Sequence, residues 1–175
     1  MTDALRAKLE NIRLLVLDVD GVLTDGTVIV NEDGTETKHF SVLDGHGIRL
    51  WKRAGLEIAL ISGRFSAPTQ RRADQLEIGH VFQDCHFKLP VLKELLGKLG
   101  LTPDQVAYIG DDLPDVPVLR YVGFSIAVAG SAELLKQHAD YTTATPGGKG
   151  AVREVIEFIL KGTDRWDSLM ERYLS

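Results

Sequence analysis

Short apolar runs recur along the whole chain, separated by polar segments that contain glycine or proline. The run at residues 12–17 (Ile-Arg-Leu-Leu-Val-Leu) is apolar at every position but one, which is typical of a strand buried on both faces of a parallel sheet. Similar runs predict further strands at residues 56–61, 80–82, 105–109, 124–128 and 139–142.

Between these runs, apolar residues return every three or four positions, as on one face of an amphipathic helix. The spacing predicts helices at about residues 47–54, 68–77, 88–99, 152–160 and 164–174, one that ends near Tyr121, and one that begins with Ser131 as its N-cap. Regular alternation of strands and helices predicts an α/β fold, in which a doubly wound, Rossmann-like parallel sheet carries helices on both faces.

One segment interrupts the alternation directly after the first strand. Two β-prone runs, residues 27–30 and 35–40, flank an Asn-Glu-Asp-Gly turn and predict a β-hairpin at about residues 26–40. This insertion is too small to be a second domain, and no repeat or linker divides the rest of the chain. We therefore expect residues 1–175 to form a single domain without a cap domain.

Composition narrows the classes of partner and compartment. The net charge of −5 gives no support for nucleic acid or an anionic membrane as the main partner. A single cysteine, Cys85, excludes an intrachain disulfide and suits a reducing cytosol. The N-terminus lacks the apolar segment of a signal peptide, and no apolar run is long enough to span a bilayer. These features predict a cytoplasmic protein.

The first candidate chemistry lies where the first predicted strand ends, at Asp18-Val-Asp20-Gly21. Side chains alternate along an extended chain, so Asp18 and Asp20 point in one direction, at the edge of the sheet where α/β folds bind ligands. Two neighbouring carboxylates are costly to bury unless a cation or a proton lies between them. The pair indicates a divalent metal, a proton-transfer role, or both; taken alone, it is equally consistent with a solvated turn.

Three further motifs follow predicted strands or open helices. Ser62-Gly63-Arg64 follows the second long apolar run, Lys88 opens a helix, and residues 110–115 read Gly-Asp-Asp-Leu-Pro-Asp. A cation at a helix start opposes the helix dipole, which is easier to understand if Lys88 binds phosphate and pairs with an acid. A helix cap explains one of the three acids in residues 110–115, but not all of them.

In this order, the motifs resemble those of the haloacid-dehalogenase-like phosphatases, and the resemblance covers roughly the whole chain. Residues 20–26 (Asp-Gly-Val-Leu-Thr-Asp-Gly) with the hairpin, Asp44-Gly-His-Gly-Ile-Arg49 and residues 147–155 are similar to one subfamily, the 3-deoxy-D-manno-octulosonate (KDO) 8-phosphate phosphatases. The resemblance implies a Mg²⁺-dependent hydrolase that releases phosphate from KDO 8-phosphate, and so makes KDO for lipopolysaccharide synthesis.

The resemblance also implies roles for individual residues. Asp18 is the nucleophile that forms an aspartyl phosphate, and Asp20 is the general acid and base. Ser62 and Lys88 hold the phosphate.

A second set of roles concerns the metal. The resemblance implies that Mg²⁺ is bound by the carboxylates of Asp18 and Asp111 and by the main-chain carbonyl of Asp20. Asp112 and Asp115 orient waters or Lys88.

For the substrate, the resemblance implies contacts at Asp20, Ser41, Asp44, Gly45, Arg49, Gly63, Arg64, Arg72 and Lys88. Arginines suit the carboxylate of a sugar acid because they bind it in a bidentate manner. For Arg49 and Arg72, a solvated helix surface is an equally good explanation. The resemblance further implies a homotetramer in which a neighbouring subunit completes the pocket.

Two alternatives stay open at this point. One is a phosphatase for a related nine-carbon sugar acid 9-phosphate, with the same chemistry. The other is a non-catalytic scaffold or oligomerisation domain. The presence of every motif residue, from Asp18 to Asp111, argues against an idle site.

Overall fold

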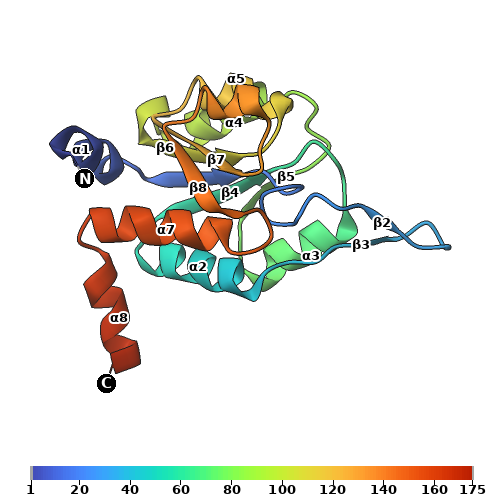
Figure 1. Cartoon of the computed structure of the whole chain (residues 1–175), viewed down its shortest axis with the longest axis horizontal. Coiled ribbons are helices and arrows are strands. Elements are labelled where there is room, and N and C mark those ends of the chain that lie inside the picture. Colours follow the sequence, from blue (N-terminus) through green and yellow to red (C-terminus); the bar gives the residue numbers. More distant parts are fainter. Residues whose placement is uncertain (1, 175) are drawn as a thin grey trace.

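The computed structural model describes residues 2–174, and a six-stranded parallel sheet forms its centre (Figure 1). The strands are β1 (Leu14–Leu17), β4 (Glu57–Ile61), β5 (His80–Phe82), β6 (Val106–Gly110), β7 (Phe124–Ala129) and β8 (Tyr141–Pro146). Their order across the sheet is β5-β4-β1-β6-β7-β8, and every neighbouring pair is parallel. The first strand therefore lies near the centre, with a partner on each side.

Helices cover both faces of this sheet (Figure 1). One face carries α1 (Asp3–Glu10), α2 (Val42–Arg53), α3 (Ala67–Gln75) and α7 (Ala151–Gly162), and the other carries α4 (Lys88–Leu99), α5 (Val116–Leu119) and α6 (Glu133–Lys136). Alternate residues of β1 enter two separate cores: Leu15 and Leu17 pack on the α2 and α7 side, Leu14 and Val16 on the α4 side. The predicted fold class is confirmed.

The C-terminal helix α8 (Trp166–Leu174) extends away from the sheet (Figure 1). It follows the predicted segment closely but buries no side chain completely. Its Tyr173 hydroxyl accepts a hydrogen bond from Arg53 Nη1 at 2.7 Å and lies 2.9 Å from His46 Nε2. These contacts tie α8 to α2. Among the described residues, no helix has the length and the apolar stretch that crossing a membrane requires.

The predicted hairpin is confirmed, with shorter strands than expected. It consists of β2 (Ile29–Val30) and β3 (Glu36–Thr37), which pair antiparallel and project from the body of the molecule (Figure 1). Ile29 lies opposite Thr37, and Val30 lies opposite Glu36. The remaining residues of the two β-prone runs form no ladder because they serve as connections to the sheet and to α2.

Several predicted boundaries were wrong. Helix α2 begins at Val42 rather than Gly47, with Ser41 as its N-cap. Glycine has a low helix propensity, but here it allows close packing: a Cβ on Gly45 would lie 2.3 Å from Arg72 Nη2. Ser131 caps no helix, because its hydroxyl donates to the Val128 carbonyl.

Two more elements differ from the sequence pattern. Helix α1 was not predicted, and β8 covers residues 141–146 instead of 139–142. A single buried residue, Leu9, anchors α1, so its sequence carries little amphipathic signal. Strand β8 lies at the edge of the sheet and contains several exposed residues, which obscures its pattern.

The strand register fixes where the polar motifs meet. Leu17 of β1 lies opposite Leu60 of β4 and Ile109 of β6, and the Asp18 N–H donates to the Ile109 carbonyl at 3.0 Å. The residues that follow these strands therefore emerge together at the carboxyl-terminal end of the parallel sheet.

Candidate active site

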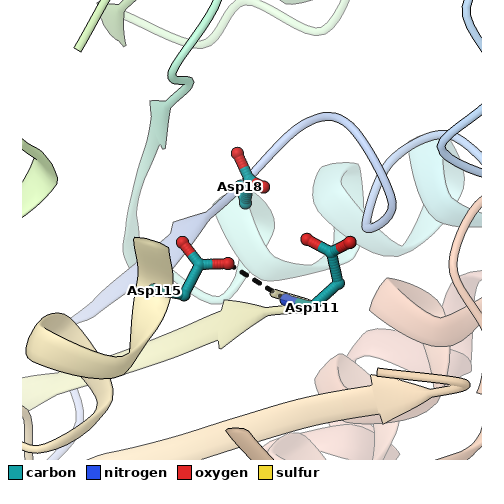
Figure 2. Close-up of side chains that lie close together, drawn as sticks. All are labelled: Asp18, Asp111 and Asp115. Carbon is teal, nitrogen blue, oxygen red and sulfur yellow. Dashed lines mark hydrogen bonds between the residues drawn. The ribbon is translucent and has the colours of Figure 1, made fainter. Parts of the chain in front are cut away.

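Three carboxylates converge at this end of the sheet. One carboxylate oxygen from each of Asp18, Asp111 and Asp115 lies within 4.8 Å of the other two, and Figure 2 shows the three side chains close together. Asp18 follows β1, Asp111 follows β6, and Asp115 ends the 3₁₀ helix η2 (Leu113–Asp115). Asp18 is 7% exposed and Asp115 is 1% exposed, so water screens their mutual repulsion poorly.

Lys88 supplies the compensating positive charge. Its Nζ lies 2.8 Å from Asp18 Oδ1 and 2.6 Å from Asp115 Oδ1, and the residue is buried. Burial by itself would lower the pKa of Lys88, but the two carboxylates outweigh this effect and raise it, so the side chain is charged. The ion pairs explain why a lysine is tolerated as the first residue of α4.

The carboxylate of Asp115 is fully engaged by the protein. Its Oδ1 accepts hydrogen bonds from Lys88 and from the Tyr108 hydroxyl, each at 2.6 Å. Its Oδ2 accepts the Asp111 N–H at 3.0 Å, the dashed line in Figure 2. Tyr108 was not predicted as a site residue, although a tyrosine in a buried strand indicates a polar partner for its hydroxyl.

A second cluster surrounds Asp20 and involves the hairpin. Asp20 Oδ1 accepts a hydrogen bond from Lys38, whose side chain is only 3% exposed. Arg64 Nη1 lies 3.8 Å from Asp20 Oδ2, and Arg64 Nη2 pairs with Glu36. Neither Lys38 nor Glu36 was predicted as a site residue. Their spacing of two positions within the β-prone run at residues 35–40 is the sequence signal that could have grouped them.

Residues from both clusters line one pocket of about 350 Å³. Of the residues predicted from the sequence, those lining it are Asp18, Asp20, Ser62, Gly63, Arg64, Lys88, Asp111, Asp112 and Asp115. Val28 of the hairpin segment contributes an apolar wall. The pocket thus combines a cationic group, several carboxylates and an apolar side, the features of a site for a phosphorylated organic molecule.

Comparison with known proteins agrees with this geometry. The haloacid dehalogenase-like hydrolase family matches residues 81–156. The KDO 8-phosphate phosphatase KdsC of Escherichia coli is 47% identical over 161 residues, which are 92% of this chain and 86% of that protein. The chain belongs to the KDO 8-phosphate phosphatase family of haloacid dehalogenase-like hydrolases.

Solved structures of the same family share the whole architecture. The Moraxella catarrhalis KDO 8-phosphate phosphatase, in complex with magnesium, phosphate and KDO, has a TM-score of 0.95 and 43% identity, and the match covers 99% of both chains. The Yersinia pestis enzyme has a TM-score of 0.91 and 45% identity, over 94% of this chain and 89% of that one. At these sequence identities, the likeness supports membership of the same family as well as the same fold.

The carboxylate cluster fits a hard divalent cation. Burial and the charge of Asp115, partly offset by Lys88, raise the pKa of Asp18 to about 6. Burial and the charges of Asp18 and Asp115 raise the pKa of Asp111 to about 8. The donors are all oxygens, which suits Mg²⁺ in this phosphatase family. Both oxygens of Asp115 accept hydrogen bonds within the protein, and Asp18 and Asp111 stay the predicted carboxylate ligands.

Glycines allow the main chain to approach this cluster. Gly21 has a φ of +92°, and a Cβ there would lie 2.0 Å from Asp111 Oδ2. A Cβ on Gly147 would lie 1.7 Å from the Gly21 carbonyl oxygen, and the Gly148 N–H donates to the Val22 carbonyl at 2.9 Å. Residues 147–148 therefore pack main chain against main chain on the turn that follows Asp18.

Five predicted substrate contacts lie outside this pocket. Ser41 caps α2 and its carbonyl accepts from Arg72 Nη2 at 3.2 Å. Asp44 is buried, and its carboxylate accepts the N–H groups of Gly150 and Arg153 at the start of α7. Gly45, Arg49 and Arg72 line a separate pocket of about 290 Å³. A substrate role for these residues stays a prediction that requires a second subunit.

The raised carboxylate pKa values predict how the metal-free protein responds to pH. Asp18 and Asp111 bind protons more tightly in the folded than in the unfolded state, so their stabilising effect is full below about pH 4 and is lost as pH rises toward about 8. Asp111→Asn should therefore raise the Tm of the metal-free protein at about pH 8 and weaken the increase in Tm on adding Mg²⁺.

Thermal unfolding with a chelator or with Mg²⁺, at about pH 5, 6.5 and 8, measures both effects. Asp3→Asn, an exposed change on α1 at the opposite edge of the sheet, serves as the control. An Asp111→Asn protein that gains no stability at the highest pH would contradict the electrostatic account of the cluster.

Proposed function

We propose that this protein is a Mg²⁺-dependent phosphatase that hydrolyses KDO 8-phosphate to KDO and inorganic phosphate through an aspartyl phosphate. The observation that carries the proposal is the pocket in which Lys88 bridges Asp18 and Asp115 beside Asp111, in a chain of the KDO 8-phosphate phosphatase family. We further propose that residues 1–175 act as one capless domain in the cytoplasm.

In the first step, a carboxylate oxygen of Asp18 forms a bond to phosphorus while the bond from phosphorus to the sugar oxygen breaks. Lys88, 2.8 Å from Asp18 Oδ1, orients this nucleophile and offers its ammonium group to the phosphate. When bound, Mg²⁺ neutralises the charge between the carboxylate and the anionic phosphate. Asp20, which lines the same pocket, gives a proton to the departing alkoxide.

In the second step, a water molecule attacks the phosphorus of the aspartyl phosphate, and Asp20 takes its proton. The bond between phosphorus and Asp18 breaks, and inorganic phosphate leaves. Asp20 is thereby ready to act as an acid again, and the Asp18 carboxylate is restored.

Substrate selection is assigned to the outer part of the pocket. Arg64 is partly exposed there, and a guanidinium suits the carboxylate of a sugar acid. Gly63 exposes main chain beside it, and Ser62 holds this turn together, because the Arg64 N–H donates to its Oγ at 3.3 Å.

We also propose that the protein is a homotetramer in which a neighbouring subunit closes the pocket. Several large apolar residues that are exposed lie close in sequence to site residues. They are Val28, Val30, Phe65, Phe87 and Leu113. Val28 lines the pocket, and Phe65 and Phe87 are the immediate neighbours of Arg64 and Lys88. Apolar groups exposed together mark interaction surfaces more often than solvated ones, and this one would exclude water from the reaction.

Phosphate release from a panel of sugar phosphates, with and without Mg²⁺, tests the reaction. We expect Mg²⁺-dependent release, fastest from KDO 8-phosphate, and a loss on the order of 10⁴-fold or more in kcat for Asp18→Asn, because the amide is a poor nucleophile. Asp3→Asn should keep the activity. Faster release from a nine-carbon sugar acid 9-phosphate would make that compound the substrate. No release from any sugar phosphate would favour a non-catalytic scaffold.

Solution mass and activity together test the assembly. Val30→Glu places a charge on an exposed apolar position of the hairpin and should reduce both the mass and kcat/KM, because an uncovered pocket selects and desolvates its substrate less well. Leu134→Glu, an exposed apolar position on α6, is the matched control. Light scattering at the assay concentration gives the mass. A monomer with full activity would refute the proposed closure.

A further inference from the structure

We infer that Lys38 of the hairpin is a positioning residue that holds Asp20 in place for proton transfer. This inference rests on the proposed phosphatase function and assigns part of the catalytic machinery to the insertion. The residue acts through Asp20, and not by contact with the reacting atoms.

The contact between the two residues is direct and shielded. Lys38 directly follows β3, and its ammonium group donates to Asp20 Oδ1. The Lys38 side chain is 3% exposed and that of Asp20 is 22% exposed. A lysine is rarely buried to this degree unless its charge is paired, and Asp20 supplies the paired charge.

The pairing divides the two oxygens of Asp20 between two tasks. Oδ1 is held by Lys38, whereas Oδ2 is buried without a hydrogen-bond partner among residues 2–174. Arg64 Nη1 approaches Oδ2 only to 3.8 Å, beyond hydrogen-bond distance. Because Asp20 lines the pocket, Oδ2 is the oxygen left to exchange a proton with the leaving group.

The hairpin holds a second group of the site in the same way. Glu36, two residues before Lys38, pairs with Arg64 Nη2. Glu36 in β3 and Lys38 just after it thus each hold a side chain that lines the pocket, Arg64 and Asp20. Lys38 and Glu36 therefore couple the position of the hairpin to that of Asp20 and Arg64.

The dependence of kcat on the leaving group distinguishes a residue that positions the general acid from one whose loss disturbs the whole site. We expect Lys38→Met to lower kcat for KDO 8-phosphate by about 10- to 100-fold, the usual effect of removing a group that orients a catalytic residue. The loss should be much smaller for p-nitrophenyl phosphate, whose leaving group needs little protonation. KM should change little. Lys98→Met, an exposed lysine at the far end of α4, is the control.

A double-mutant cycle with Asp20→Ala tests whether Lys38 acts through Asp20. If it does, Lys38→Met causes no further loss in the Asp20→Ala background. Independent, multiplying losses would overturn the inference. So would equal losses on both substrates, or a raised KM with unchanged kcat, which would make Lys38 a substrate contact.

Thermal unfolding checks that the variants are folded, independently of any activity assay. The Mg²⁺-induced increase in Tm should persist in Lys38→Met, because the carboxylates of Asp18 and Asp111 are untouched. If this variant does not fold at the assay temperature, Lys38→Arg serves in the same cycle, since it keeps the charge but alters the geometry. A wild-type protein without Mg²⁺-dependent phosphatase activity would refute the proposed function itself, an outcome distinct from multiplying losses in an active enzyme.

Discussion

The repulsion among three clustered carboxylates is the constraint on which the rest of the site depends. Asp18, Asp111 and Asp115 bring their oxygens within 4.8 Å of one another, and a single buried ammonium group, Lys88, lies against two of them. The cluster is therefore short of positive charge whenever all three are ionised. Protons, a divalent cation and a transferring phosphate with its metal are the species that change this balance, and they are the species the reaction uses.

The surrounding structure serves to hold that unfavourable arrangement in place. Asp115 is fixed by hydrogen bonds from Tyr108, Lys88 and the N–H of Asp111, and it links these groups to one another. Gly21 lets the main chain pass against Asp111, where any side chain would collide. The crowded carboxylates lower the stability of the metal-free protein, and binding of a cation raises it again. The site thus trades intrinsic stability for a strong dependence on its ligand.

The sequence predicted this site well where chain-local rules apply, and less well where packing decides. Residues that end parallel strands must share an edge, so the convergence of Asp18, Ser62 and Asp111 followed from the pattern of apolar runs alone. Lys38 could not be found this way. Its burial depends on how the β2–β3 hairpin packs against the turn that contains Asp20. The start of α2 was missed because its glycines serve contacts with α3 and α7, which no local propensity records.

No cap domain is present among residues 2–174, and the hairpin combines two kinds of side chain. Val30 lies opposite Glu36 in the β2–β3 ladder, so the face that carries Glu36 also carries an apolar side chain. Glu36 pairs with Arg64, and Lys38, just after β3, pairs with Asp20, whereas Val30 is 67% exposed. An insertion that only assembled subunits would have no reason to bury Lys38, and one that only positioned Asp20 would have no reason to expose Val30. The proposed closure of the pocket by a neighbouring subunit and the inferred alignment of Asp20 would therefore both depend on this one insertion.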